Sequence, residues 1–144
     1  MKVNKMVFTF SSLPENVMLS RMLASALGTQ LDLPINELEE LKVAISEAVS
    51  NAIIHGYKND PEKYVTLELE ASPENIIIKI SDTGCGIPDI KQAMQASFTT
   101  NPDRMGLGFI FMQSFMDELK VESEIDKGTT VTMVKKIKHP QSPH

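Results

Sequence analysis

The spacing of apolar residues changes along the chain between a period of two and the period of a helix. Met6, Phe8 and Phe10 recur at every second position, which predicts an opening strand that ends near residues 11–14. The same two periods return further along the chain. They predict, in order, helices over residues 15–31 and 36–56, paired strands over 64–70 and 75–81, a short helix over 90–95, a helix over 108–116, and strands over 118–124 and 129–137, with Asn36 as the N-cap of the second helix.

This order of elements predicts the fold class. Strands and helices do not alternate strictly, so we expect an α+β fold, a two-layer α/β sandwich with helices on one face of a mixed, mostly antiparallel sheet. Residues 84–105 interrupt the pattern with glycines, prolines and a polar run, and a connector of this length inside a compact domain favours a mobile lid. We expect residues 1–137 to form a single domain and residues 138–144 a disordered tail.

Composition limits the class of protein, its possible partners and its cellular compartment. The chain has 144 residues, of which 42% are apolar and 23% charged, as in a globular protein with a core. A formal charge of -5 without a dense Lys/Arg cluster argues against direct binding to nucleic acid or to an anionic membrane. The single cysteine, Cys85, cannot form an internal disulfide, and no long apolar run marks a signal peptide or a membrane span. We therefore expect a cytoplasmic protein.

Glu47 and Asn51 lie four residues apart on the second predicted helix, on a face away from its apolar stripe. A carboxylate can take a proton from a hydroxyl, and an amide oxygen can join the ligands of Mg²⁺. A pair at this spacing is more often part of a solvated helix face when it stands alone. The neighbouring motifs decide between the two readings.

Asp82 ends an apolar strand and precedes Gly84 and Gly86. A carboxylate at this edge of the sheet can accept a hydrogen bond from an exocyclic amine, which favours adenine over guanine, while the glycines let a flat ring approach the backbone. The alternative is a turn in which aspartate and glycine serve only to reverse the chain.

A phosphate site is indicated at Gly106, Leu107 and Gly108, because the free N–H groups at the start of a helix attract anions. The sequence has neither a P-loop nor the dinucleotide-binding fingerprint, so a site of another kind is required. Arg104 could meet a terminal phosphate or could be a solvated side chain, and Thr130 enters the last strand with a hydroxyl. In this order the four motifs predict an ATP site.

The segments 46–57, 98–100 and 122–130 carry a closer likeness. With the motifs above, the chain resembles the ATP-binding superfamily of DNA gyrase, Hsp90, histidine kinases and MutL. Within it, the chain is most similar to the anti-sigma-F factors of spore-forming bacteria, small serine kinases also called stage II sporulation protein AB, over nearly its whole length. The resemblance implies a Bergerat-type ATP-binding fold with a mobile lid.

The resemblance also implies a function. Such a protein is a homodimer that binds and inhibits sigma factor F of RNA polymerase, and it uses Mg-ATP to phosphorylate a serine of the anti-anti-sigma factor, stage II sporulation protein AA. By position, the implied roles are Glu47 as general base, Asn51 as Mg²⁺ ligand, Asp82 as adenine reader, Gly84 and Gly86 as the loop beside the ring, Gly106, Leu107 and Gly108 around the phosphates, Thr99, Thr100 and Arg104 in the lid, and Thr130 closing the adenine side. Arg21 on the first helix is expected on the partner surface.

Three other functions compete with this reading. The first is a non-catalytic module in which the nucleotide only gates protein binding. The second is an ATP-hydrolysing conformational machine, and the third is the catalytic domain of a histidine kinase. The amino acid that receives the phosphate separates the last of these from a serine kinase.

Overall fold

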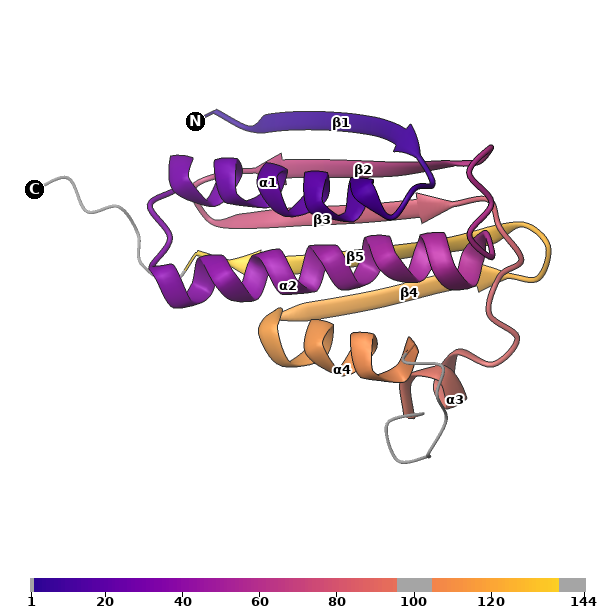
Figure 1. Ribbon diagram of the computed structural model, residues 1–144. Coiled ribbons are helices and arrows are strands. Elements are labelled where there is room, and N and C mark those ends of the chain that lie inside the picture. The colour runs from indigo at the N-terminus through magenta and orange to yellow at the C-terminus, as the bar shows by residue number, and fades with distance from the viewer. Residues whose placement is uncertain (1, 96–104, 138–144) are drawn as a thin grey trace, which may run out of the picture.

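Helices cover one face of a five-stranded sheet (Figure 1). The computed structural model describes residues 2–95 and 105–137 of the chain. In chain order the elements are β1 (Asn4–Ser11), α1 (Glu15–Gln30), α2 (Ile35–Asn51), the π-helical turn η1 (Ala52–Gly56), β2 (Tyr64–Ala71), β3 (Asn75–Asp82), α3 (Ile90–Gln95), α4 (Met105–Phe115), β4 (Glu118–Glu124) and β5 (Gly128–Lys136). The predicted α+β sandwich is confirmed, whereas the expected tail over 138–144 lies outside the described residues.

The strands lie in the order β1-β2-β3-β5-β4, and every neighbouring pair is antiparallel. The prediction of a mixed sheet is therefore wrong for the strands that the structure describes. The connection through α3 and α4 does bring β4 back parallel to β3. However, β5 follows β4 in a hairpin and inserts between the two, so no parallel pair shares hydrogen bonds.

Helix α2 lies between α1 and α4 on the helical face of the sheet (Figure 1). Its apolar stripe packs against the inward-facing side chains of the central strands. The largest fully buried side chains are Leu27, Leu41, Ile45, Ile53, Leu67, Leu69, Ile76, Ile78, Ile80, Phe109, Met112 and Met133. This packing on three sides fixes which residues α2 presents at its C-terminal end.

The start of α2 differs from the prediction. The helix begins at Ile35, so Asn36 lies in its first turn, and the prediction that Asn36 is the N-cap is wrong. Pro34 occupies the N-cap with an extended backbone, and no side chain caps the helix there. Because proline supplies the extended conformation that precedes a helix, the N-cap lies two positions earlier than the asparagine suggested.

Two further boundaries bear on function. Helix α4 begins at Met105, so Gly106 and Gly108 belong to its first turns instead of preceding it. The other end of α2 widens into the π-helical turn η1, where the Tyr57 N–H donates to the Ala52 carbonyl at 3.0 Å. Such turns occur often at functional sites and shift the helix end relative to the body of the helix.

The face of the sheet away from the helices carries charged pairs. Glu68 lies 4.0 Å from both Lys5 and Lys79, and Lys120 lies 3.6 Å from Glu122. Antiparallel sheets commonly face water on one such polar side. Within residues 2–95 and 105–137 no helix has the length and apolar character needed to cross a bilayer.

One ion pair lies inside the molecule. Lys135 follows Val131 and Met133 on the inward face of β5, and its Nζ lies 3.6 Å from Glu37 Oε1 in the first turn of α2. The two residues are only 6% and 9% exposed. Breaking a buried pair by removing one partner costs about 3 kcal/mol or more, because the other charge stays buried without compensation.

We predict that Lys135→Met lowers the free energy of unfolding by about 3 kcal/mol. The matched change Lys136→Met, on the exposed neighbour, should alter it by less than about 0.5 kcal/mol. Urea denaturation followed by circular dichroism measures both values. Equal effects of the two substitutions would show that the buried pair does not hold α2 against β5.

Candidate functional site

A cavity opens where the C-terminal end of α2 meets the end of β3, the start of β5 and the first turns of α4. Its apolar walls are Ala48, Ala52, Ile80, Ile87, Phe109 and Val131, and its other lining residues are Asn51, His55, Gly56, Asp82, Gly86 and Thr129. Apolar walls with a few convergent polar groups are typical of small-molecule sites. Of the predicted nucleotide residues, Asn51, Asp82 and Gly86 thus line one cavity.

Asp82 is the last residue of β3 and is only 9% exposed. Its Oδ1 accepts the Gly84 N–H at 2.9 Å, and the Thr129 backbone N–H also donates to the carboxylate. Burial raises the pKa of Asp82, and these two backbone hydrogen bonds oppose that rise. The structure therefore holds a desolvated acceptor at the edge of the cavity, at the end of the strand.

Gly84 serves a purpose that differs from the predicted one. It does not line the cavity, because it packs against the backbone of Gly56, where an added Cβ would lie 2.1 Å from the Gly56 carbonyl oxygen. The same carbonyl accepts the Cys85 N–H at 2.9 Å. Gly86 does line the cavity, and its φ of 78° favours glycine. Of the two predicted ring-side glycines, therefore, Gly86 lines the cavity and Gly84 does not.

Glu47, Asn51 and Gly108 meet across the gap between α2 and α4. A Cβ built on Gly108 would lie 3.3 Å from Asn51 Nδ2 and 3.5 Å from Glu47 Oε2. Both α2 side chains are partly exposed, which keeps them open to a ligand. The absence of a side chain at position 108 leaves the carboxylate and the amide facing the start of α4, where backbone N–H groups and the helix dipole favour phosphate.

Asn51 has unused hydrogen-bonding capacity. Its Nδ2 is buried, and within the part of the chain that the structure describes it has no hydrogen-bond partner. Such groups are rare in proteins, and this one belongs to a residue that lines the cavity. In the described residues, no group of three or more His, Cys, Asp or Glu side chains could hold a metal ion. A Mg²⁺ ion would therefore depend mainly on phosphate oxygens, with the Asn51 amide oxygen as a protein ligand, and this arrangement suits Mg²⁺.

Thr130 lies on the wrong face of the sheet for its predicted role. It pairs with Ser81, and its Oγ1 lies 3.5 Å from Ser81 Oγ, on the side away from the cavity. Thr129 pairs with Asp82 and lines the cavity instead. Since neighbouring residues of a strand face opposite ways, counting back from the apolar Val131 would have selected Thr129.

Ser123 connects Thr129 to the segment that follows Gly86. Its Oγ accepts the Ile87 N–H at 2.7 Å and lies 2.8 Å from Thr129 Oγ1 and 3.1 Å from the Gly128 carbonyl oxygen. No role in the site was predicted for Ser123, Thr129 or His55 from the sequence. His55 belongs to the π-helical turn η1 and lines the cavity.

The remaining predicted site residues divide into two groups. Gly106 and Leu107 lie in the first turn of α4, and Leu107 is exposed. Thr99, Thr100 and Arg104 lie outside the described residues, as does the whole segment 96–104 of the expected lid.

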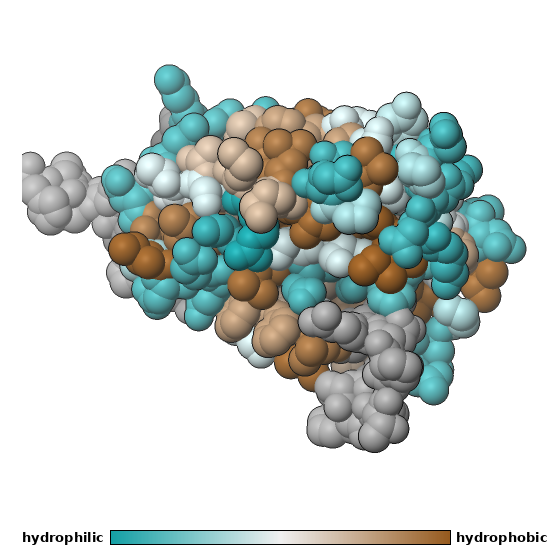
Figure 2. All heavy atoms as spheres, in the orientation of Figure 1, coloured by the Kyte–Doolittle hydropathy of each residue, from teal (hydrophilic) through white to brown (hydrophobic). Residues whose placement is uncertain are grey.

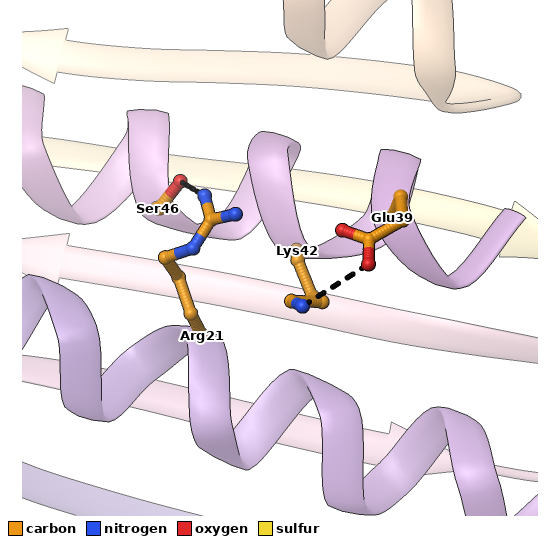
Figure 3. Close-up of polar contacts among 4 residues, drawn as sticks. All are labelled: Arg21, Glu39, Lys42 and Ser46. Atoms are coloured by element: carbon orange, nitrogen blue, oxygen red, sulfur yellow. Dashed lines mark hydrogen bonds and ion pairs between the residues drawn. The ribbon is translucent and has the colours of Figure 1, made fainter. Parts of the chain in front are cut away.

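Arg21 lies on the side of α1 that meets α2. Its Nη1 donates to Ser46 Oγ at 3.0 Å, and Lys42 pairs with Glu39 nearby at 3.3 Å (Figure 3). The side chains of Met18 and Met22 are exposed on the same helix. Figure 2 shows apolar atoms gathered over the position of α1 beside polar atoms. Helix α1 thus carries exposed apolar side chains and a charged group.

A model of the histidine kinase-like ATPase domain matches residues 10–135. The anti-sigma F factor of Geobacillus kaustophilus is 46% identical over 136 residues, which cover 93% of this chain and 93% of the relative. The anti-sigma F factor of Clostridium beijerinckii is 44% identical over 138 residues, which cover 94% of this chain and 96% of the relative.

Solved structures agree on the fold. The RsbU and RsbW domains of a Mycobacterium tuberculosis protein match with a TM-score of 0.63 and 18% identity, over 92% of this chain and 31% of that chain. The histidine kinase domain of the blue-light activated kinase from Erythrobacter litoralis EL346 matches with a TM-score of 0.56 and 19% identity, over 83% of this chain and 59% of that chain. From the family model and the close relatives together, the chain belongs to the histidine kinase-like ATPase family and, within it, to the anti-sigma F factors.

Proposed function

We propose that this anti-sigma factor is an ATP-dependent protein-serine kinase. It binds and inhibits the sporulation sigma factor F, and it phosphorylates a serine of the anti-anti-sigma factor that opposes it. It acts in the cytoplasm as a homodimer and uses Mg²⁺. The observation that carries the kinase proposal is the placement of Glu47 and Asn51 against Gly108, beside a cavity that ends at the buried Asp82 carboxylate.

The cavity suits adenine at one end and phosphates at the other. A flat ring fits between apolar walls that include Ile80 and Phe109, with its amine directed to Asp82. The N-terminal turn of α4 then lies on the side of Glu47 and Asn51, where phosphates would find backbone N–H groups. Mg²⁺ supplies neutralisation of phosphate charge when it is bound.

Glu47 would act on the substrate. Its carboxylate takes the proton of the serine hydroxyl as the serine oxygen bonds to the γ-phosphorus, and the bond from that phosphorus to the bridging oxygen of ADP breaks. Phosphoryl transfer needs mainly positioning and charge neutralisation from the protein. A base and a phosphate cradle that face each other across one gap supply that positioning.

The partner surface is proposed on the helical layer. Arg21 and the exposed methionines of α1 offer a charged and an apolar contact on one face. The open face of the sheet instead carries charged pairs that are satisfied within the chain, such as those of Glu68. Sigma factor F is therefore expected to contact α1 and its surroundings.

A second candidate function uses the same nucleotide site but catalyses no phosphate transfer. In this alternative the nucleotide only gates protein binding, and Glu47 contributes a solvated carboxylate. The partial exposure of Glu47 is compatible with both readings. Transfer of phosphate distinguishes them, because the binding module would hold ATP and sigma factor but leave the anti-anti-sigma factor unmodified.

We predict that Glu47→Gln lowers the rate of phosphate transfer from Mg-ATP to serine of the anti-anti-sigma factor by about 10²- to 10⁴-fold, the usual contribution of a general base. ATP affinity should stay within about twofold, since the carboxylate acts on the substrate hydroxyl. Labelled γ-phosphate and phosphoamino-acid analysis measure the transfer, and calorimetry measures binding of ATP.

Glu70→Gln provides the matched control for Glu47→Gln, because it removes the same charge from the face of the sheet away from the helices. It should leave both transfer and ATP binding unchanged. If wild type binds ATP and sigma factor F but transfers no phosphate, the kinase proposal is wrong and the nucleotide-gated binding module remains. Transfer to histidine would instead indicate a histidine-kinase domain.

Asp82→Asn should change protein stability and nucleotide binding in opposite directions. Burial raises the pKa of Asp82 in the folded state, so its contribution to stability is fully present below the unfolded pKa and is lost as pH rises through the folded value. At neutral pH the ionised carboxylate therefore destabilises the ligand-free protein. We predict that Asp82→Asn raises the free energy of unfolding at pH 7 by about 1 kcal/mol and weakens ATP binding by about 10- to 100-fold.

Thermal unfolding between pH 4 and pH 8 and calorimetric titration with ATP measure these effects. The stability difference between Asp82→Asn and wild type should shrink toward acidic pH, where the wild-type carboxylate is protonated in the folded state. Asp126→Asn, at an exposed position, is the control and should change neither property. Unchanged ATP affinity in Asp82→Asn would remove Asp82 from the role of adenine reader.

A further inference from the structure

Tyr57 is a buried tyrosine whose hydroxyl lies at the meeting point of three segments. The residue is 6% exposed and follows η1 directly. Its hydroxyl donates to the Tyr64 carbonyl at 2.6 Å and accepts the Thr83 N–H at 2.8 Å. The Thr83 Oγ1 lies a further 3.2 Å from the same oxygen. The start of β2 and the turn after β3 are thus connected through one phenol group.

The order of these hydrogen bonds follows from the chemistry of the groups. The Tyr57 hydroxyl has one hydrogen to donate, and the Tyr64 carbonyl can only accept, so that hydrogen points to Tyr64. The Thr83 N–H and the Thr83 hydroxyl must then both donate to the Tyr57 oxygen. These two hydrogen bonds hold the backbone of Thr83 in place, and Thr83 is the residue immediately after Asp82.

Gly56, the residue before Tyr57, also contacts Asp82. A Cβ at Gly56 would lie 2.8 Å from Asp82 Oδ1, so the backbone of η1 lies directly against the carboxylate. Tyr57 fixes the chain behind Asp82, and Gly56 limits where the side chain can lie. Without the phenol oxygen, the Thr83 N–H loses its acceptor, and the turn can shift to hydrate it because Thr83 is exposed.

We propose that Tyr57 is a positioning residue for recognition of the nucleotide base, and that its hydroxyl sets the direction of the Asp82 carboxylate in the cavity. This inference rests on the ATP binding proposed above. Tyr57 does not line the nucleotide cavity, so it acts through Thr83 and Asp82 and not by contact with the base. Loss of the Tyr57 hydroxyl should therefore reduce the preference for adenine, while the part of the binding free energy that comes from the phosphates should change less.

The test compares Tyr57→Phe with Tyr64→Phe in the full-length chain. Both remove one phenol oxygen, but the Tyr64 side chain lies at a residue that is 61% exposed. We expect Tyr57→Phe to weaken ATP binding about tenfold, the effect of one buried hydrogen bond, while GTP affinity changes by less than about twofold. The preference for ATP over GTP should thus fall about tenfold, and Tyr64→Phe should match wild type.

Calorimetric titrations with ATP and GTP give the preference, and thermal unfolding reports stability separately. A lower Tm with an unchanged ATP preference would assign Tyr57 a purely structural role and overturn the inference. If wild type itself shows no Asp82-dependent preference for ATP, the proposed nucleotide site fails first. If Tyr57→Phe does not fold, 3-fluorotyrosine at position 57 decides, because the fluorine weakens the phenol oxygen as acceptor of both Thr83 donors while the ring is kept. An unchanged preference would then overturn the proposal.

Discussion

The buried carboxylate of Asp82 is the constraint on which the site depends. A desolvated carboxylate costs stability unless backbone donors face it, and a ligand can use it only if one lone pair remains accessible. The strand pairing meets the first condition, since β5 brings the Thr129 N–H opposite Asp82, and the following turn supplies the Gly84 N–H. The cavity meets the second. In the proposed ATP site, the burial that raises the pKa of Asp82 is therefore the same burial that would make its carboxylate a selective acceptor for the base.

Holding that carboxylate requires close backbone packing at the end of α2. Gly56 and Gly84 approach each other where no side chain would fit, and the Gly56 carbonyl takes up the Cys85 N–H. A continued α-helix would direct residues 55–57 differently, because the π-helical turn adds a residue to the last turn. The local departure from regular helix geometry thus serves the contact between η1 and the turn after β3. It also explains why His55 faces the cavity.

The sequence predicted the elements, and three of the twelve residues that line the cavity, because their signals are local. Asp82 follows an apolar strand, and Glu47 and Asn51 share a helix face, so local spacing predicted where these side chains lie. Thr130 was misplaced because a paired glycine and threonine motif does not state which threonine faces inward, although the alternation with Val131 does. The antiparallel insertion of β5 and the π-helical turn depend on contacts between distant segments, which no local pattern contains.

Helix α2 places the two proposed activities one residue apart. Ser46 faces α1 and accepts the hydrogen bond of Arg21, whereas Glu47 faces α4 and the space above Gly108. The helix is buried against the sheet by Ile45 and Val49, so it cannot rotate to favour one neighbour without disturbing the core. A partner bound to α1 and a nucleotide bound beside α4 therefore contact opposite sides of the same rigid element. Any differential affinity of a partner for the nucleotide-bound form must be expressed through this helix or through segments that touch both ligands.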